Sequence, residues 1–398
     1  MMLEPPAASR PVRVLIVDDS AVARELIRDI LEQDSGLTVV GTAPNGIEGV
    51  RLVEKLRPDV VTMDIHMPKL GGFEATQQIM QRFPVPIVIM SGSLDTGEVS
   101  ISFQAMAAGA VAVIQRPAGV GNPAFSADSL ALIRIVKAMS EVKVVRRWPV
   151  AIFGKEDHLR SGTGNGNSAV SASRNEAVTN GSDTVSLQSG SRFALGTETR
   201  NFDLIAIGTS TGGPQALLAM LSRMPVTLPV PIVIVQHMSD GFMPGYIEWL
   251  SRSVPFPVHL AVHAELLLPG HIYLAPDGFH LTVTPYSRVH LVDSPPEHGL
   301  RPCVSALFRS VAKSFGLRAV GVLLTGMGTD GAAELKEMRD QGAMTIAQNQ
   351  ESCVVFGMPG QAVKLDAAEH ILSPEEIADL LTRLFHLTSP TIRAVPDL

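Results

Sequence analysis

The sequence predicts an α/β protein with two doubly wound domains, each built on a mainly parallel sheet, and three observations lead to this prediction. Apolar runs of strand length alternate with helix-length stretches in both halves of the 398-residue chain. Several runs end in Asp, Ser, His or Gly, as strands do where the carboxyl edge of a parallel sheet carries a site. A stretch rich in Ser, Gly, Asn and Thr, without any period, separates the halves. We expect domains over residues 1–145 and 202–390, joined by a flexible linker over 146–201.

The composition is that of an ordinary α/β protein, with 45% hydrophobic and 18% charged residues. A formal net charge of −7 provides no broad basic surface, so nucleic-acid binding is not expected. The sequence shows no charged-then-apolar leader and no apolar run long enough to span a bilayer. We therefore expect neither export nor membrane insertion, and a cytoplasmic location.

The chain has two cysteines, Cys303 and Cys353, which form no close-spaced pair and lie near no cluster of ligand residues in the sequence. They fit a reducing compartment and argue against a disulfide framework or a zinc site. Both are expected to be small core residues.

Five strands are expected in the first half, because five short apolar runs alternate there with helical stretches. The first helix is expected to begin after Ser20, whose side chain can cap it, and to run to about Glu32. A final helix over 126–145 closes the domain. The strands are expected at residues 12–17, 37–41, 59–63, 87–90 and 111–114.

Three carboxylates follow strands of this half: Asp18 and Asp19 after the first strand, and Asp64 after the third. Carboxylates that share one edge of a sheet repel one another unless a divalent cation is present, and oxygen ligands suit Mg²⁺. A carboxylate beside that ion can attack a phosphoryl group, since the metal neutralises the oxygens being transferred. The alternative is that these aspartates are only solvated caps, but the coincident signals favour a magnesium site.

This half resembles a response-regulator receiver domain, which has a flavodoxin-like fold. The resemblance implies that Asp64 accepts the phosphoryl group. It also implies that Asp18, Asp19, Asp64 and the backbone carbonyl of His66 hold Mg²⁺ for phosphorylation. Ser91, which follows the fourth strand, would sense the phosphate.

Two residues depart from the usual receiver pattern. Arg116, before Pro117, stands where receivers usually carry Lys, and the resemblance gives it the second phosphate-sensing position. Arg keeps the positive charge but not the point geometry of an ammonium. Gly71 falls where this family often has Asp. Phosphate binding is therefore expected, whereas the strength of the signal and the phosphoryl lifetime stay open.

The second half opens with an apolar run, 204–208, that ends in small hydroxyl residues and two glycines. This pattern predicts a strand, a tight turn and a helix, with Ser210 at the carboxyl end of the strand. The backbone N–H groups of Thr211, Gly212 and Gly213 would bind an anion or stabilise an oxyanion there. A glycine-rich phosphate cradle and a simple helix cap are the alternatives that this stretch alone leaves open.

Two further strands of the second half end in polar residues. The run 230–236 is followed by His237, and the run 319–324 leads into a loop that ends in Asp330. In a parallel sheet these strands bring Ser210, His237 and Asp330 to one edge. A serine becomes a nucleophile when a base takes its proton and a third group orients that base, so the set is a candidate triad. Its chain order differs from the orders in α/β-hydrolases, chymotrypsin and subtilisin.

Between these strands, short runs separated by turns suggest antiparallel strands at one edge of the second domain. The runs lie at residues 271–276, 279–283 and 288–292. His259 and His263 would share a face only on a helix, whereas Pro255 and Pro257 favour a strand. A metal is therefore not expected at these two histidines.

Four motifs of the second half closely resemble the chemotaxis receptor methylesterase and deamidase family, CheB. They are Gly208-Thr-Ser210-Thr-Gly-Gly, Gln236-His237-Met238, Arg301-Pro302 and Leu324-Thr-Gly-Met327-Gly-Thr-Asp330-Gly-Ala. The resemblance covers nearly the whole chain except the linker. It implies that Ser210 is the nucleophile, that His237 is the general base and acid, and that Asp330 orients His237. Thr211 and the backbone around Met327 would help to hold the oxyanion.

The resemblance implies a phosphorylation-controlled hydrolase. Ser210 would attack a γ-glutamyl methyl ester on a methyl-accepting chemoreceptor, methanol would leave, and water would release glutamate. Glutamine side chains would be deamidated in the same site, neither reaction needs a cofactor, and a histidine kinase would supply the phosphoryl group. Arg301 would place a substrate group or lie on the surface. Ser305, where the family often has Asp, leaves the substrate preference open.

A tether alone transmits no signal, so the receiver is expected to cover the rim that carries Ser210 and His237 until Asp64 is phosphorylated. Two rival functions remain. In one, the second domain holds a nucleotide at 208–213 and the serine does no chemistry. In the other, the chain is a phosphate sink or scaffold with an idle esterase site. Methanol release from methylated receptor separates both from the hydrolase.

Overall fold

The computed structural model describes residues 10–92, 96–142, 144 and 201–388. Of the predicted linker, only residue 201 lies within the described residues. The described residues before and after the linker belong to one compact unit. No helix among them is long and apolar enough to cross a membrane.

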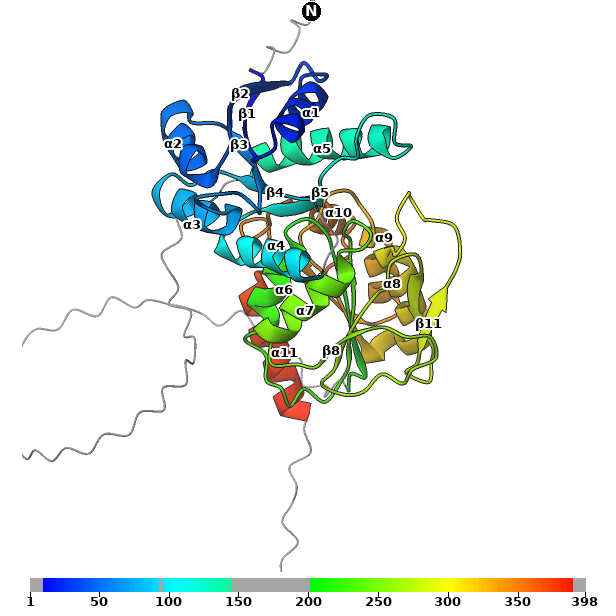
Figure 1. Cartoon of the computed structure of the whole chain (residues 1–398). Helices are drawn as coiled ribbons and strands as arrows, with labels where there is room; N and C mark the ends of the chain where they lie inside the picture. Colours follow the sequence, from blue (N-terminus) through cyan, green and yellow to red (C-terminus); the bar gives the residue numbers. More distant parts are fainter. Residues whose placement is uncertain (1–9, 93–95, 143, 145–200, 389–398) are drawn as a thin grey trace, which may run out of the picture. The chain divides into compact units, whose positions relative to one another are not determined.

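The first sheet has five parallel strands in the order β2-β1-β3-β4-β5, which confirms the predicted fold class. Its strands are β1 (Val12–Val17), β2 (Leu37–Ala43), β3 (Val60–Asp64), β4 (Ile87–Ser91) and β5 (Ala112–Gln115). Its helices are α1 (Ala21–Leu31), α2 (Gly46–Leu56), α3 (Gly72–Arg82), α4 (Thr96–Ala108) and α5 (Phe125–Ser140). Helices α1 and α5 cover one face of the sheet, and α2, α3 and α4 cover the other (Figure 1).

Side-chain hydrogen bonds lie at the start of α1 and at the end of α5. Ser20 caps α1 as predicted, because its hydroxyl accepts the N–H of Ala23. Helix α5 ends at Ser140, before the predicted end at residue 145. The Ser140 hydroxyl donates to the Lys137 carbonyl, a side-chain bond that competes with continuation of the helix.

The second sheet has seven parallel strands in the order β14-β13-β12-β6-β7-β9-β8. They are β6 (Leu204–Thr209), β7 (Ile232–Gln236), β8 (Val258–Leu260), β9 (Ile272–Leu274), β12 (Ala319–Leu323), β13 (Met344–Gln348) and β14 (His370–Leu372). The α-helices are α6 (Gly213–Leu221), α7 (Met243–Ser253), α8 (Val304–Phe315), α9 (Ala332–Asp340), α10 (Met358–Lys364) and α11 (Pro374–Thr388). Strands β12, β6 and β7 are neighbours, so the loops that follow them meet at one edge.

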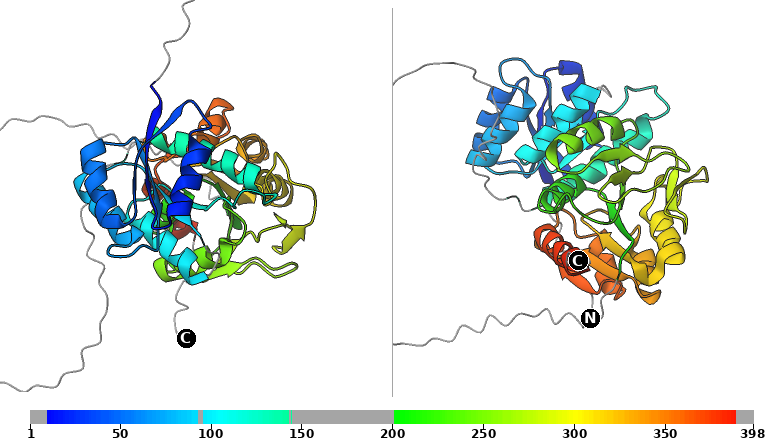
Figure 2. Two further views of the ribbon diagram at one scale, coloured as in Figure 1. Left: turned by 45° about the horizontal axis from the view of Figure 1, so that its top comes forward. Right: turned by 90° about the horizontal axis from the view of Figure 1, so that it is seen from below.

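The prediction of antiparallel strands is right for two of the three runs. Strands β10 (His280–Val283) and β11 (Val289–Val292) form an antiparallel pair, a separate two-stranded sheet that packs on α8 (Figure 2). The run at 271–276 is instead the parallel strand β9, between β7 and β8. Its three residues are all buried, as expected for a strand inside a parallel sheet covered on both faces.

His259 lies in strand β8 as predicted, whereas His263 lies in the loop that follows it. The imidazoles of His259 and His271 stack, with Nε2 of the first 2.8 Å from Nδ1 of the second. His263 Nδ1 accepts the N–H of Leu291. Neither residue belongs to a three-ligand cluster among the described residues. Of the two cysteines, Cys303 is in the core as predicted, whereas Cys353 is only partly buried.

Candidate active site

The turn between β6 and α6 presents Ser210 at the carboxyl edge of the sheet. Gly212 adopts φ +81°, a conformation that favours glycine, and α6 begins at the next residue. The Gly213 N–H donates to the Ser210 carbonyl, so it is not available to a substrate, contrary to the sequence prediction. The N–H groups of Thr211 and Gly212 make no hydrogen bond with other described residues. These two donors remain for an oxyanion.

Two glycines allow three loops to meet around Ser210. A Cβ on Gly213 would lie 2.1 Å from Gln236 Oε1, and a Cβ on Gly326 would lie 2.7 Å from the Ser210 Cβ. Both distances are too short for any side chain. The loops after β6, β7 and β12 therefore approach this closely only because glycine stands at both positions.

Hydrogen bonds from two buried polar side chains fix the loops. Gln236 Nε2 donates to the carbonyl oxygens of Ser210 (2.9 Å) and His237 (2.8 Å). Thr325 Oγ1 donates to the Thr211 carbonyl at 3.0 Å. Both residues fall within the sequence motifs of the second half, and no role was predicted for either. A glutamine at the end of an otherwise apolar strand was the available signal, because a buried amide requires partners.

The structure brings His237 and Asp330 together at this edge. His237 Nε2 lies 2.9 Å from Asp330 Oδ2, the distance of an ion pair, although the N–H is not aligned for a straight hydrogen bond. Both side chains are largely buried. With Nε2 facing Asp330, Nδ1 is the ring nitrogen left for Ser210. Ser210 and His237 line one pocket of about 230 Å³.

Asp330 is held at the first turn of α8. Its carboxylate accepts the N–H of Val304 (2.6 Å), the N–H of Ser305 (3.0 Å) and the Ser305 hydroxyl (2.5 Å). Burial alone would raise the pKa of Asp330, but its interactions with His237, Ser305 and Val304 outweigh burial and lower the pKa to about 2. Asp330 is therefore an anion at physiological pH.

The departure at Ser305 faces Asp330 and does not line the pocket beside Ser210. The Ser305 hydroxyl lies 2.7 Å from a Glu334 carboxylate oxygen as well, and it accepts the N–H of Gly331. Since a hydroxyl has one proton, it can donate to only one of the two carboxylates at a time. Ser305 thus bears on the position of Asp330, and no described contact links it to substrate choice.

Two further residues that were expected near the site are Met327 and Arg301. Met327, in the loop beside Gly326, is 39% exposed. Arg301 pairs with Asp293 at 2.9 Å and donates to the Ser294 carbonyl, so its guanidinium is tied to its own loop. Arg301 is not among the residues that line the pocket beside Ser210.

Side chains of the first domain close the pocket beside Ser210. Phe103 and Met106 of α4 and Ile114 of β5 line it together with Ser210 and His237. Residues of both domains therefore line this pocket.

An aromatic cluster and one glutamine hold this contact. The Phe103 ring centroid lies 4.9 Å from that of Tyr246 and 5.7 Å from that of Trp249, both on α7. Gln215 Nε2 donates to the Met106 carbonyl at 2.9 Å and to the Ala110 carbonyl. The contact therefore combines apolar packing with specific polar pairing.

A second cluster lies at the carboxyl edge of the first sheet. Oxygens of Asp18, Asp19 and Asp64 lie within 4.8 Å of one another. Arg116 Nη2 is 2.9 Å from Asp18 Oδ2 and 2.8 Å from Asp64 Oδ1, and Ser91 is buried at the end of β4. Asp18 Oδ2 has no aligned hydrogen bond. Buried carboxylates with spare lone pairs fit a Mg²⁺ site.

Burial sets the electrostatics of this cluster. It raises the pKa of Asp64 to about 6, although attraction to Arg116 opposes the shift, and it also raises the pKa of Asp18.

Gly71 is the N-cap of α3, which has no side-chain cap. The departure at Gly71 therefore removes a helix cap, and that residue contributes no carboxylate to the cluster.

Comparisons with known proteins place both halves. A model of the CheB methylesterase family matches residues 205–381, and a model of the response regulator receiver domain matches residues 14–122. A protein-glutamate methylesterase/protein-glutamine glutaminase of Geobacter metallireducens is 46% identical over 374 residues, 94% of this chain and 99% of the relative. The chain belongs to the CheB family. Another CheB relative, from Syntrophus aciditrophicus, is 45% identical over 95% of this chain and its own full length.

A CheB catalytic domain from Thermotoga maritima, known from a crystal structure, is 33% identical with a TM-score of 0.45. It covers 46% of this chain, which in turn covers 99% of that domain. In this CheB-family chain a receiver domain regulates a protein-glutamate methylesterase/protein-glutamine glutaminase domain. The acidic cluster of the receiver is typical of a Mg²⁺ site.

The raised pKa of Asp64 predicts that Asp64→Asn stabilises the chelator-treated protein at pH 7.5. Ionised Asp64 costs stability above its folded pKa of about 6, and the cost disappears as the pH falls towards its ordinary value near 4. The free energy of unfolding of the variant should exceed that of the wild type by about 1–3 kcal/mol at pH 7.5. Denaturant unfolding in excess EDTA measures the difference in the free energy of unfolding at pH 7.5 and near pH 4. A variant less stable than the wild type at pH 7.5 would contradict the prediction.

Proposed function

We propose that Ser210, His237 and Asp330 are the residues that hydrolyse glutamate methyl esters in this chain. The observation that carries the proposal is the pairing of His237 Nε2 with the anionic Asp330 on the rim that presents Ser210. An imidazole held in this way keeps Nδ1 free to take the proton of a serine hydroxyl. Asp330 orients His237 and stabilises its charged form.

The reaction follows as two acyl-transfer steps. Ser210 Oγ attacks the ester carbonyl while His237 takes the hydroxyl proton, and the resulting oxyanion accepts hydrogen bonds from Thr211, Gly212 and the backbone around Met327. The tetrahedral intermediate collapses, and His237 gives its proton to the departing methoxide, which leaves as methanol. Water, activated by His237, then attacks the acyl-enzyme and releases glutamate and free Ser210.

Deamidation of glutamine uses the same groups. The side-chain amide passes through a similar tetrahedral intermediate, and His237 protonates the leaving nitrogen, so ammonia departs in place of methanol. The acyl-enzyme is the same in both reactions, and neither uses a cofactor. Substrates of this kind are the methylated glutamates and the glutamines of methyl-accepting chemoreceptors in the cytoplasm.

Substitution of the three residues should reduce ester hydrolysis to different degrees. Ser210→Ala should lower kcat by about 10⁶-fold, His237→Gln nearly as much, and Asp330→Asn by about 10⁴-fold, because orientation contributes less than the nucleophile or the base. Methanol release from labelled methylated receptor measures the rates. Ser239→Ala, which removes another hydroxyl from the same pocket, is the matched control and should leave the rate unchanged. A wild-type rate in Ser210→Ala would exclude the covalent mechanism and favour a binding module or an idle site.

In the receiver domain, Asp64 accepts a phosphoryl group from a histidine kinase. Asp18, Asp19, Asp64 and the His66 carbonyl would hold Mg²⁺, which would neutralise the charge of the phosphoryl oxygens. Ser91 and Arg116 bind the phosphate once it is attached. The ion pairs of Arg116 with Asp18 and Asp64 support this assignment, because they hold a cation beside the acceptor carboxylate.

Phosphorylation by a small phosphodonor should require both Mg²⁺ and Asp64. Asp64→Asn should abolish uptake, whereas Asp29→Asn, on an exposed face of α1, should not change it. Phosphate incorporation on a Phos-tag gel, with and without excess EDTA, measures both effects. Arg116→Lys should alter activation of methanol release more than uptake, since the charge remains and the geometry changes. Uptake in EDTA or in Asp64→Asn would refute the site.

The unphosphorylated receiver holds the esterase down by covering its rim. The contacts of Phe103 with Tyr246 and Trp249, and of Gln215 with the carbonyls of α4 and its C-terminal loop, support this view. Phosphorylation at Asp64 would rearrange this face and release the substrate pocket.

We place the receiver at 1–145, the linker at 146–201 and the catalytic domain at 202–390, and the two family matches fall inside these limits.

Removing the receiver should raise the basal rate. A contact worth about 1–3 kcal/mol suppresses activity about five- to 150-fold. A fragment starting near Thr199 should therefore release methanol faster than the unphosphorylated full chain by a factor in that range. Phe103→Ala in the full chain should give part of the same gain, and phosphorylation should narrow both gaps. A folded fragment slower than the unphosphorylated full chain would mean that the receiver activates by positioning substrate or loops.

A further inference from the structure

Three potential metal ligands converge beside the N-terminus of α8, outside the two sites described above. His280 begins β10, Glu297 lies in the loop before α8, and Cys303 is the N-cap of α8. One ligand atom from each, an imidazole nitrogen, a carboxylate oxygen and the thiol sulfur, lies within 4.8 Å of the others. His280 and Cys303 are buried, and Glu297 is partly exposed.

The hydrogen bonds of His280 fix which ring nitrogen faces the cluster. Nε2 lies 3.2 Å from the carbonyl oxygen of Pro295. A carbonyl only accepts, so Nε2 carries the proton, and the lone pair of Nδ1 points to Cys303 Sγ at 3.3 Å. A metal-binding histidine typically donates its other N–H to a carbonyl in this way, which orients the ring and makes it a better ligand.

The sulfur of Cys303 is placed as a metal-bound thiolate would be. It accepts the N–H of Ala306 at 3.3 Å at the positive end of the α8 dipole. Burial raises the pKa of the free thiol to about 12, so the thiolate depends on the bound cation. In a tetrahedral zinc site, bonds of about 2.3 Å to sulfur and 2.0 Å to nitrogen put these two atoms about 3.5 Å apart. The observed 3.3 Å separation is close to that value.

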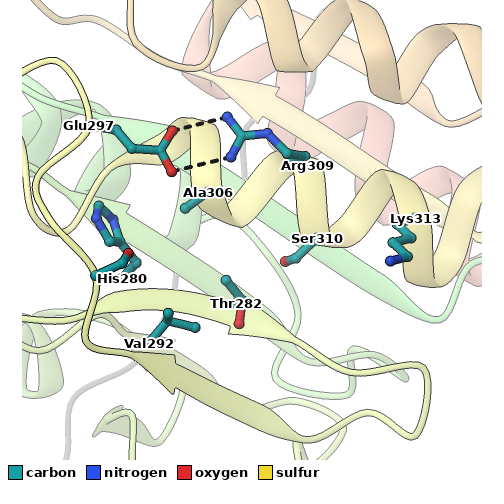
Figure 3. A pocket seen from close by; sticks show the side chains of 9 residues that line it. His280, Thr282, Val292, Glu297, Ala306, Arg309, Ser310 and Lys313 are labelled. Atoms are coloured by element: carbon teal, nitrogen blue, oxygen red, sulfur yellow. Dashed lines mark hydrogen bonds and ion pairs between the residues drawn. The ribbon is translucent and has the colours of Figure 1, made fainter.

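Glu297 can bind a cation without leaving its present partner. Arg309 donates to both oxygens of its carboxylate, at 3.2 and 3.0 Å, and each oxygen keeps a second lone pair (Figure 3). Arg309 also pairs with Glu334. With Cys303 as a thiolate, the two carboxylates, the thiolate and the guanidinium carry two net negative charges. A divalent cation neutralises that charge.

Two of the three ligands, His280 and Glu297, line a pocket of about 290 Å³ between β10, β11 and α8, and Cys303 is not among its lining residues. His280 and Glu297 lie at one end of this pocket, and Lys313 lies at the other (Figure 3). A metal can enter here, and a water molecule can complete the tetrahedron as the fourth ligand.

We propose that His280 Nδ1, Glu297 and Cys303 Sγ form a zinc-binding site. Nitrogen, sulfur and oxygen donors in this number favour Zn²⁺, whereas the all-oxygen cluster of the receiver favours Mg²⁺. The site shares α8 with the candidate triad, because the residues after Cys303 donate their N–H groups to Asp330. Zinc was not expected from the sequence, because Cys303 and Cys353 form no close-spaced pair and lie near no cluster of ligand residues there. His280 is 23 residues from Cys303 and reaches it only in the folded chain.

Cobalt binding to the full-length protein tests the proposal. The reduced, metal-free protein is titrated with Co²⁺ in excess Mg²⁺, which occupies the acidic cluster of the receiver. Coordination by Cys303 should produce a thiolate-to-cobalt charge-transfer absorption, which carboxylates cannot give, together with the visible bands of tetrahedral cobalt. Zinc should displace the cobalt and abolish both signals. A wild-type protein without the charge-transfer absorption would overturn the site.

Matched variants identify the ligands. Cys303→Ser should abolish the charge-transfer absorption and still fold, because serine caps a helix well, and Cys353→Ser should retain it. Glu297→Gln keeps an amide oxygen for Arg309 but should weaken zinc binding by more than about tenfold. Absorption that survives Cys303→Ser, or that only Cys353→Ser removes, would refute the assignment. If Cys303→Ser fails to fold in a thermal melt, an unchanged zinc affinity in Glu297→Gln refutes it instead.

Discussion

The site of the second domain depends on the interactions of the buried Asp330 carboxylate. The carboxylate receives two backbone N–H groups from the first turn of α8, one hydroxyl from Ser305 and the imidazole of His237. These partners keep it ionised despite its burial, and they connect the loop after β12 to α8 and to the loop after β7. Removing one partner would leave a buried charge with fewer donors, so a substitution in the first turn of α8 is expected to affect His237 through Asp330.

The rest of the site requires three loops to approach one another closely. Three parallel strands end side by side, and their loops can meet only where no side chain intervenes, at Gly213 and Gly326. Gln236 then holds the loops with its amide, which bonds to the carbonyls of Ser210 and His237. The two glycines permit the close approach of the loops, and Gln236 maintains it. Preorganisation of this kind holds hydrogen-bond donors in the positions that an oxyanion requires, so that they need not rearrange.

The sequence predicted most of the fold because burial on both faces makes the parallel strands continuous apolar runs, and Ser210, His237 and Asp330 follow such runs. The strand at 271–276 was assigned to the wrong kind of pairing, since a short apolar run carries no information about the direction of its neighbours. The donation of the Gly213 N–H to Ser210 depends on a turn geometry that residue types do not specify. The contact of Ser305 with Asp330 and the cluster around Cys303 were not predicted for another reason: their partners come from different elements, so only tertiary packing brings them together.

The contact between Phe103 and the rings of Tyr246 and Trp249 gives the regulation a dependence on temperature. These side chains are almost completely buried, and separating the domains would hydrate their aromatic surface. Hydration of apolar surface carries a positive heat-capacity change, and the attraction between such surfaces weakens on cooling. On the proposed inhibition by covering, this contact weakens on cooling, and the unphosphorylated protein is expected to be less inhibited at low temperature.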